Sequence, residues 1–270
     1  MKMVSVVVAT YNSEETVIEL LDSIAGQTYP DIELIVTDDC SKDGTIPLVR
    51  QWCSVHKSRF HRIVLTISKK RQGVVYNVNR GISKIRSEYI KLIAGDDVLL
   101  PNCIEDNMAF LTNHDYGLVF SKLDVFGNKK AAIEKRATLE KNYQLLRQGD
   151  TIGILKEMYL PSPSIFLTKQ LFSQLGGFDT RFPNWEDAPF YTKMICKNIP
   201  FGFLDCETVR YRIHKKNHKI YRGFAVDYIK VYLLVRIPAL MRFGEVKFAF
   251  RQLNGVYRQI KRLLFEELIE

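Results

Sequence analysis

Cysteine is scarce in this sequence of 270 residues, and the cysteines present are scattered along it. They are Cys40, Cys53, Cys103, Cys196 and Cys206. Their number is odd, and no two of them form a CxxC pair. Disulfide frameworks and structural zinc sites use cysteines at short, recurring spacings. The sequence therefore argues against both and indicates a reducing compartment.

Glycine-rich phosphate-binding loops are missing as well. The uncharged run Val4–Ala9 predicts a buried first strand, but no GxGxxG follows it and no GxxxxGK[ST] occurs anywhere. These motifs cradle the phosphates of dinucleotide cofactors and of triphosphates in P-loop enzymes. Their absence excludes both classes. A pyrophosphate held without such a loop needs a metal ion.

The sequence also lacks a long uninterrupted apolar run. Its most apolar stretch, 228–241, is interrupted by Lys230, Arg236 and Pro238 and is too short to span a bilayer. A single Lys precedes the first apolar run, without the layout of a signal peptide. We therefore expect a cytoplasmic chain.

What the sequence does contain is a repeated alternation of strand and helix patterns. Apolar runs predict strands at 4–9, 32–37, 62–67 and 90–94, and helical spacing predicts helices at 14–26, from 45 to 52 and at 73–86. Such alternation predicts an α/β fold with a parallel, doubly wound sheet. Later patterns predict a helix at 140–155, a strand at 165–167 and a helix ending at Ile195. Four basic residues near Gly127 are expected in a mobile loop: Lys129, Lys130, Lys135 and Arg136.

Two adjacent carboxylates, Asp96 and Asp97, follow the strand predicted at 90–94. Gly95 permits a sharp turn, and Pro101 can start the next helix. The carboxylates would lie at the carboxyl edge of a parallel sheet, where open α/β sheets bind ligands. Two like charges this close favour a divalent cation with hard oxygen ligands, Mg²⁺ or Mn²⁺. The alternative is a solvated helix cap, which needs one Asp.

Positive charge is concentrated at the end of the sequence. Residues 209–270 hold 14 Lys and Arg against five Asp and Glu, which accounts for the whole net charge of +9. In the last predicted helix, apolar and basic residues form separate rows: Val246, Leu253, Val256, Ile260 and Leu264, and Lys247, Arg251, Arg258 and Arg262. This pattern is typical of a membrane-surface helix. Alternatively, the apolar row packs on the α/β domain or on a second subunit, as in a homodimer. Nucleic acid is disfavoured, because no binding motif accompanies the charge.

Several motifs, taken in order, resemble the family-2 inverting glycosyltransferases of the GT-A fold. The matching pieces are Val4–Asn12, Ser23–Tyr29, Glu33–Thr45, Glu88–Ile90, Gly95–Asp97, Gly176–Asp179 and Glu186–Asp187. They cover roughly residues 3–215. The resemblance implies a GT-A catalytic domain at 1–215, with a nucleotide-binding half at 1–100 and an acceptor half at 101–215. A basic helical extension at 216–270 would follow.

The resemblance also assigns a donor site. Tyr11 would lie against the nucleotide base, Asp39 would accept a hydrogen bond from a uracil imide, and Thr10 and Glu14 would flank the pocket. Arg71 would contact the base or the diphosphate. Asp96 would bind the ribose and help to bind Mn²⁺ or Mg²⁺, which Asp97 would ligate. His214 stands where relatives carry a His near the diphosphate or metal, with His218 as a nearby competitor.

The sequence departs from the family pattern at two positions. Ala94 stands where many members have a further Asp, so metal dependence is expected with modest affinity. Val78 stands where many have Arg, so Arg71 or Arg80 would supply the basic contact.

A second carboxylate pair, Glu186 and Asp187, supplies the expected general base. An inverting transfer needs a carboxylate on the acceptor side of the sugar to remove the hydroxyl proton. Asp187 is the expected base, with Glu186 as the alternative, and Trp185 could raise its pKa by desolvation. Asp187 could also cap the helix that follows, since Pro189 suits a first turn.

The resemblance thus implies a metal-dependent inverting glycosyltransferase. It would use a UDP-sugar and a glycan acceptor linked to a lipid diphosphate, in bacterial surface-polysaccharide synthesis of the O-antigen or lipopolysaccharide kind. The enzyme would sit on the inner face of the cytoplasmic membrane. The alternatives are a nucleotidyltransferase, which would want a basic glycine-rich loop, and a non-catalytic nucleotide-sugar-binding protein. Residues 122–160 are unassigned, although 140–155 could help to form the acceptor side.

Overall fold

The computed structural model describes residues 2–157, 160–214 and 222–265. The expected domain boundary at 215–216 and the competitor His218 lie outside these residues. So do the side chains of Arg262 and Leu264 in the last helix.

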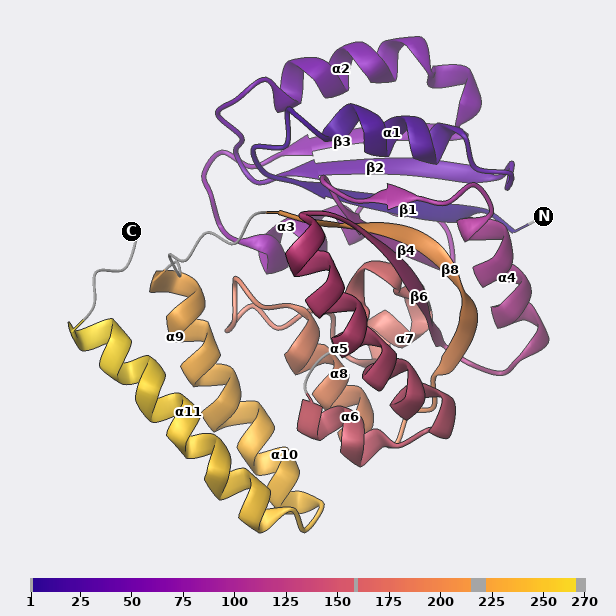
Figure 1. The fold of residues 1–270 in the computed structure, drawn as a ribbon. Coiled ribbons are helices and arrows are strands. Elements are labelled where there is room, and N and C mark those ends of the chain that lie inside the picture. The colour runs from indigo at the N-terminus through magenta and orange to yellow at the C-terminus, as the bar shows by residue number, and fades with distance from the viewer. Residues whose placement is uncertain (1, 158–159, 215–221, 266–270) are drawn as a thin grey trace.

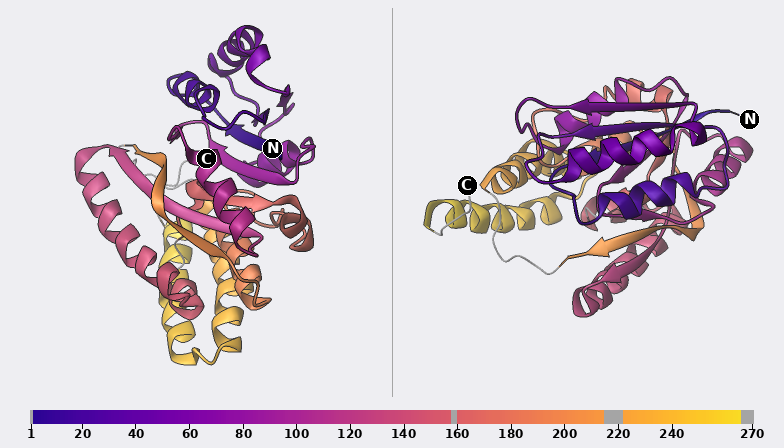
Figure 2. Two further views of the ribbon diagram at one scale, coloured as in Figure 1. Left: turned by 90° about the vertical axis from the view of Figure 1, so that its right-hand side faces the viewer. Right: turned by 90° about the horizontal axis from the view of Figure 1, so that it is seen from above.

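The strands form one eight-stranded sheet in the order β3-β2-β1-β4-β7-β6-β8-β5 within the described residues (Figures 1 and 2). They are β1 (Val4–Thr10), β2 (Ile32–Asp38), β3 (Arg62–Ile67), β4 (Tyr89–Ala94), β5 (Val98–Leu99), β6 (Leu118–Gly127), β7 (Phe166–Thr168) and β8 (Gly202–Ile213). The first half, β3-β2-β1-β4, is parallel throughout, and β6 pairs with β8 in parallel. β7 and β5 pair antiparallel with their neighbours. The expected α/β fold with a mostly parallel sheet is confirmed.

Helices follow most strands and cover the sheet. They are α1 (Val17–Ala25), α2 (Thr45–Val55), α3 (Val74–Ile82), α4 (Cys103–Asn113), α5 (Lys129–Gln148), α6 (Thr151–Glu157), α7 (Lys169–Gln174) and α8 (Asp187–Cys196), with the short 3-10 turns η1 (Lys57–Arg59) and η2 (Ser162–Ser164). Close packing selects glycine in α3, because a Cβ at Gly81 would lie 2.7 Å from Val7 and 2.8 Å from Thr37. α3 therefore presses directly on β1 and β2.

One expectation about the central segment is wrong. Lys129, Lys130, Lys135 and Arg136 belong to α5, not to a loop. The Asn128 side chain caps this helix by accepting from the Ala131 amide, and Gly149 ends it in a left-handed conformation with φ of 63°. Charged residues outnumber the apolar ones in the first turns, so the helical periodicity is weak there.

The C-terminal segment forms a helical hairpin. Its first arm consists of α9 (Arg222–Val231), a π-helical turn η3 (Tyr232–Arg236) and α10 (Ile237–Arg242), and its second arm is α11 (Val246–Phe265). Figure 1 and the left view of Figure 2 show the hairpin projecting from the end of the molecule opposite α1 and α2. Among the helices that the structure describes, none combines the length and hydrophobicity needed to cross a bilayer.

Candidate active site

The carboxyl ends of β1, β2 and β4 meet at one edge of the sheet. Thr10 pairs with Asp38, and Ala9 pairs with Ala94, so the loops that follow these strands lie side by side. Tyr11, Glu14, Asp39 and Asp96 stand on these loops because parallel strands bring their carboxyl ends together, and Arg71 follows β3, the neighbour of β2.

Thr10 and the first Asp of the Asp38–Asp39 pair have structural roles here. Both side chains are buried, and the Thr10 hydroxyl donates to Asp38 over 2.9 Å, which ties β1 to β2. Asp39 is also buried, and its carboxylate accepts from the backbone amides of Gln72 (2.9 Å) and Gly73 (2.8 Å). Asp39 therefore fixes the loop before α3, and its expected role in base recognition stays a prediction.

Three more of the predicted donor residues lie at this edge of the sheet: Tyr11, Arg71 and Glu14. The guanidinium carbon of Arg71 lies 4.4 Å from the centre of the Tyr11 ring, which is 37% exposed. Arg71 thus covers one face of the Tyr11 ring. A nucleotide base could stack on this ring. The Glu14 carboxylate accepts from the Gly44 amide and joins the loops after β1 and β2.

An open pocket of about 360 Å³ lies beside these loops. Its lining includes Tyr11, Glu14, Asp96 and His214, which come from three separate parts of the chain. The fold thus unites four of the expected donor and metal residues around one pocket.

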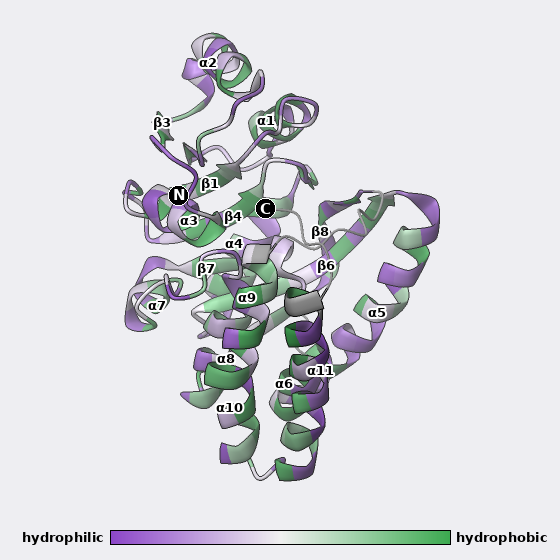
Figure 3. Cartoon of the chain, turned by 90° about the vertical axis from the view of Figure 1, so that its left-hand side faces the viewer, coloured by the Kyte–Doolittle hydropathy of each residue, from purple (hydrophilic) through white to green (hydrophobic). Residues whose placement is uncertain are grey.

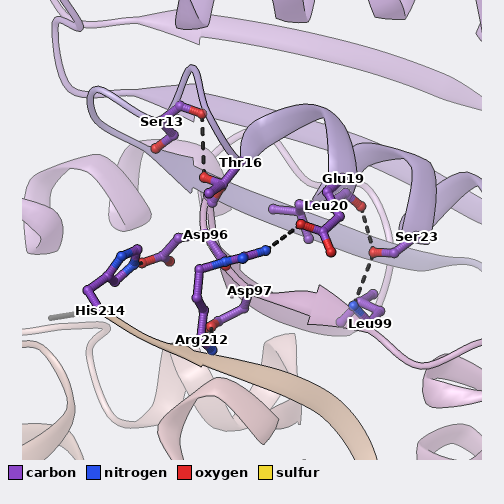
Figure 4. Close-up of polar contacts among 11 residues, drawn as sticks. Ser13, Thr16, Glu19, Leu20, Ser23, Asp96, Asp97, Leu99, Arg212 and His214 are labelled. Carbon is purple, nitrogen blue, oxygen red and sulfur yellow. Dashed lines mark hydrogen bonds and ion pairs between the residues drawn. The ribbon is translucent and has the colours of Figure 1, made fainter. Parts of the chain in front are cut away.

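The Asp96–Asp97 turn is held from β8 (Figure 4). The Arg212 amide donates to the Asp97 carboxylate over 2.9 Å, and its guanidinium donates to the Asp96 carbonyl over 2.8 Å and to Glu19. The His214 ring lies 2.9 Å from the Asp96 carboxylate. Arg212 was missed in the sequence, because nothing in the order of residues places it 116 positions away, beside Asp96.

The donor set of this turn fits a hard divalent cation. Asp97 is 2% exposed, and burial together with the charge of Asp96 raises the pKa of its carboxyl to about 7. A buried carboxylate beside another gains from a cation. Within the described residues, no group of three or more His, Cys, Asp or Glu side chains could hold an ion by itself. Mg²⁺ commonly binds through one or two carboxylates completed by substrate phosphates, and the pair suits that mode.

The second carboxylate pair lies on the other side of Ala9 and Ala94. Glu186 and Asp187 line a cavity of about 120 Å³ together with Asp97. Val78 and Ala94, the two departures from the family pattern, line the same cavity. Many family members have an Arg and an Asp at these two positions. Because Val78 and Ala94 are both apolar, the cavity holds neither of these two charges without the other.

Asp187 begins α8, and its carboxylate is firmly oriented. It accepts from the Ser162 hydroxyl and from the Ala188 amide, both over 2.6 Å. Burial raises the pKa of Asp187, although these hydrogen bonds oppose the rise. Burial and the charge of Asp187 raise the pKa of Glu186 to about 8. The hydrogen-bonded Asp187 is therefore the first of the pair to ionise.

Two further groups, to which the sequence assigned no role in the site, stand near this pair. Tyr211 of β8 lies among the carboxylates, and burial and their charges raise its pKa to about 12. The ammonium of Lys135, from α5, lies 5.5 Å from the centre of the Tyr211 ring, and burial lowers its pKa to about 8. The previously unassigned α5 thus contributes a basic group near Asp187.

The helical hairpin also contacts this region. The buried Asp227 carboxylate of α9 accepts from the amide of Asn184 (2.8 Å) and from its side chain (3.0 Å). The Trp185 ring stacks on Tyr228 with centres 5.7 Å apart. α9 therefore supports the loop that leads into Glu186 and Asp187.

A comparison with protein families matches residues 5–172 to "Glycosyl transferase family 2". The chain belongs to this family, and the glycosyltransferase class expected from the sequence is confirmed. The matched region contains β1 to β7 and both carboxylates of the Asp96–Asp97 turn.

Curated relatives include EpsE of Bacillus subtilis strain 168, named as a glycosyltransferase, with 34% identity over 134 residues. That match covers 48% of this chain and 47% of EpsE. The poly(ribitol-phosphate) β-N-acetylglucosaminyltransferase TarS of Staphylococcus aureus is 29% identical over 275 residues, covering 95% of this chain and 46% of TarS. The chain thus spans about half the length of these relatives.

Solved structures share the fold. TarS 1–349 in complex with UDP-GlcNAc gives a TM-score of 0.67 at 20% identity, covering 94% of this chain and 74% of that one. The mannosyltransferase PcManGT of Pyrobaculum calidifontis, in complex with GDP-Man and Mn²⁺, gives 0.65 at 19% identity and covers 97% and 74%. The GT-A architecture with a helical C-terminal region is therefore confirmed.

Proposed function

We propose that the chain is a metal-dependent inverting glycosyltransferase that uses a nucleotide-sugar donor, with Asp187 as general base. One observation carries the proposal. A single cavity is lined by Asp97 from the donor edge and by Asp187 from the acceptor half. The donor pocket lies next to it, since Ala9 and Ala94 line both.

The chemistry follows from this placement. The acceptor hydroxyl oxygen forms a bond to the anomeric carbon while the bond from that carbon to the diphosphate oxygen breaks. Asp187 takes the hydroxyl proton, and its hydrogen bonds from Ser162 and Ala188 aim the carboxylate. A divalent ion bound at Asp96 and Asp97 would neutralise charge developing on the leaving diphosphate.

The donor is expected to be a UDP-sugar. TarS was solved with UDP and with UDP-GlcNAc, and the pocket near Tyr11 and Arg71 offers stacking for a base. PcManGT was solved with GDP-Man, so a GDP-sugar is the competing donor. We test the proposal with UDP-, GDP- and dTDP-sugars in Mn²⁺, with and without EDTA. Release of the nucleoside diphosphate that chelation and Asp97→Ala abolish supports it.

A negative turnover result is also informative. If no donor turns over, thermal-shift titration with free nucleotides distinguishes two cases. Metal-dependent stabilisation by UDP or GDP fits a transferase that requires its acceptor. No stabilisation by any nucleotide refutes the proposal. Donor binding with full turnover in Asp187→Asn would instead refute the assigned base.

A membrane-bound acceptor is the second part of the proposal. α11 packs inward through Ala249, Val256 and Gln259 and leaves a second apolar row exposed, which we call the outer stripe. The outer stripe consists of Val246, Phe250, Leu253, Tyr257 and Ile260, each at least 37% exposed. Exposed basic residues run beside it: Lys247, Arg251, Arg258 and Lys261. Figure 3 shows hydrophobic and polar residues interleaved along the projecting hairpin.

The expectation that the apolar residues of the last helix share one side is wrong. Of the apolar residues expected to share a side, Val256 is buried, whereas Val246, Leu253 and Ile260 are exposed. An exposed apolar row flanked by cations fits the surface of an anionic bilayer. This favours a lipid-linked glycan acceptor at the cytoplasmic membrane, in surface-polysaccharide assembly. Co-sedimentation with phosphatidylglycerol vesicles tests it, and a stable homodimer by light scattering without vesicle binding would favour the second-subunit alternative.

A further inference from the structure

Lys91 occupies an unusual place in the fold. It lies in the middle of β4, flanked by β1 and β7, and its side chain is fully buried. Burying an ammonium group is costly unless hydrogen bonds compensate. The Lys91 ammonium donates to the carbonyl of Pro163 over 2.6 Å and to that of Ile165 over 3.3 Å. Burial lowers the pKa of Lys91, which is consistent with this dry location.

The two carbonyls belong to η2 and the residue that follows it. This turn is fixed from a second side by Ser164, whose hydroxyl donates to Pro161 over 2.7 Å and accepts from the Ser121 amide over 3.0 Å. The residue before Pro163 is Ser162, whose hydroxyl donates to Asp187. An uninterrupted connection therefore runs from Lys91 through η2 to the carboxylate of Asp187.

The same strand also positions the donor edge. β4 ends at Ala94, and the Asp96–Asp97 turn follows directly. Pro163 and Ser162 line the cavity that contains both Asp97 and Asp187. β4 thus holds one carboxylate pair through its backbone and reaches the other through the Lys91 side chain.

We propose that Lys91 is a positioning residue that holds Ser162 against Asp187 and so sets the general base in register with the donor site. The inference rests on the proposed role of Asp187. A lysine suits the task because one ammonium can donate to two backbone carbonyls at once. A neutral apolar side chain would leave both carbonyls buried without these bonds.

Loss of the connection has a defined consequence for Asp187. The Ser162 hydrogen bond favours the ionised carboxylate, so weakening it raises the pH at which the base becomes active. The other charged or titratable groups facing Asp187 stay in place: Glu186 before it, Lys135 from α5, Tyr211 from β8 and Asp97 across the cavity. The Lys91 charge lowers the pKa of Asp97, so Lys91→Met also removes that effect. A change in the acidic limb of the pH–rate profile reports on the Lys91–Ser162 connection when Lys91→Met shares it with Ser162→Ala, because Ser162→Ala keeps the Lys91 charge.

The experiment is a double-mutant cycle with Lys91→Met and Ser162→Ala in the full chain. Activity is Mn²⁺-dependent release of nucleoside diphosphate from the sugar nucleotide found active in the donor panel, beginning with UDP-N-acetylglucosamine. Each single variant is expected to lower kcat about tenfold, with donor KM nearly unchanged, and to move the acidic limb up by about one pH unit. The double variant should be no slower than the slower single variant.

Two further variants keep the result interpretable. Lys91→Gln keeps one donor for the Pro163 carbonyl and should recover part of the loss if Lys91→Met folds poorly. Asn107→Ala is the control, since Asn107 is fully buried in α4 and donates to the Cys103 carbonyl, away from the cavity. It should lower the melting temperature and leave the acidic limb in place.

Either of two outcomes overturns the inference. One is a loss in Lys91→Met that follows stability alone, with the limb unmoved as in Asn107→Ala. The other is a double variant whose loss is the product of the single losses. Asp187→Asn distinguishes a failure of the Lys91 inference from a failure of the proposed function. If Asp187→Asn keeps its turnover, the assignment of Asp187 as the base has failed. If Asp187→Asn is inactive while Lys91→Met leaves the acidic limb unmoved, only the Lys91 inference has failed.

Discussion

Replacing Glu186 by Gln should reveal how the carboxylate pair divides its work. Hydrogen bonds from Ser162 and Ala188 stabilise the Asp187 carboxylate, whereas burial and the charge of Asp187 hold the pKa of Glu186 at about 8. The hydrogen bonds favour ionisation of Asp187 before Glu186, and the raised pKa of Glu186 keeps that side chain mostly protonated at pH 7. Gln resembles that protonated acid in shape and charge. Glu186→Gln should leave the acidic limb of the pH–rate profile in place and keep kcat at pH 7 within about threefold of the original value. Asp187→Asn should lower kcat about 10²-fold or more.

The same substitution should change how stability depends on pH. The pKa of Glu186 is raised from 4.5 to about 8, so the folded state binds this proton more tightly than the unfolded chain. Its stabilising contribution is complete below about pH 4.5 and is lost as the pH rises towards 8. A rise of about 3.5 corresponds to at most about 5 kcal/mol at 1.36 kcal/mol per pH unit. Because both side chains are partly exposed to solvent, which screens the interaction, we expect about 2 kcal/mol.

Calorimetry at pH 5, 6, 7 and 8 measures this effect. For a chain of this size, about 2 kcal/mol corresponds to about 4–8 °C in Tm. The fall in Tm between pH 5 and 8 should be smaller by that amount in Glu186→Gln than in the original chain. Glu88→Gln, at an exposed position, should leave the fall unchanged. The assignment of the proton to Glu186 would be refuted if Tm fell equally between pH 5 and 8 in Glu186→Gln and in the original chain. It would also be refuted if Glu186→Gln were as inactive as Asp187→Asn.

Three further predictions concern other parts of the site. Asp97→Ala should abolish the stabilisation that Mn²⁺ with nucleoside diphosphate gives in thermal-shift assays, and EDTA should do the same to the original chain; stabilisation that survives both would exclude metal binding at this turn. Asp227→Ala leaves the Asn184 amide without its acceptor, so it should lower the free energy of unfolding by about 2 kcal/mol and reduce kcat; denaturant unfolding that matches the original chain would contradict this. Phe250→Asp in the outer stripe should weaken binding to anionic vesicles about tenfold or more without changing hydrolysis of donor in solution, and unchanged sedimentation would count against membrane docking.

The secondary-structure pattern carried most information where periodicity was strong. The uncharged run of β1 and the helical spacing of α1 identified these elements because a buried strand or an amphipathic helix must place apolar residues at fixed intervals. α5 was missed over its first turns because its stability comes from the Asn128 cap and from scattered buried positions such as Ala132 and Leu139. Charge there concealed the helical period.

The site divides along similar lines. Motifs in the sequence indicated both carboxylate pairs, because adjacent acids after a strand and before a helix are visible in one dimension. Lys91 in the strand at 90–94 gave no sign of its role, since its partners Pro163 and Ile165 lie more than 70 positions away. Arg212 and Ser162 were missed for the same reason.

The sequence by itself thus determined the α/β alternation, the family and the carboxylates that would meet substrate. Each of these depends on neighbours within a few residues. Tertiary structure alone decided that Asp97 and Asp187 share a cavity and that the Asp39 carboxylate accepts hydrogen bonds from the loop before α3. It also decided that the C-terminal hairpin supports the loop leading into Glu186 and Asp187. These facts depend on contacts between distant segments. Hydrogen bonds and burial fix such contacts once the sheet has formed, and no local pattern encodes them.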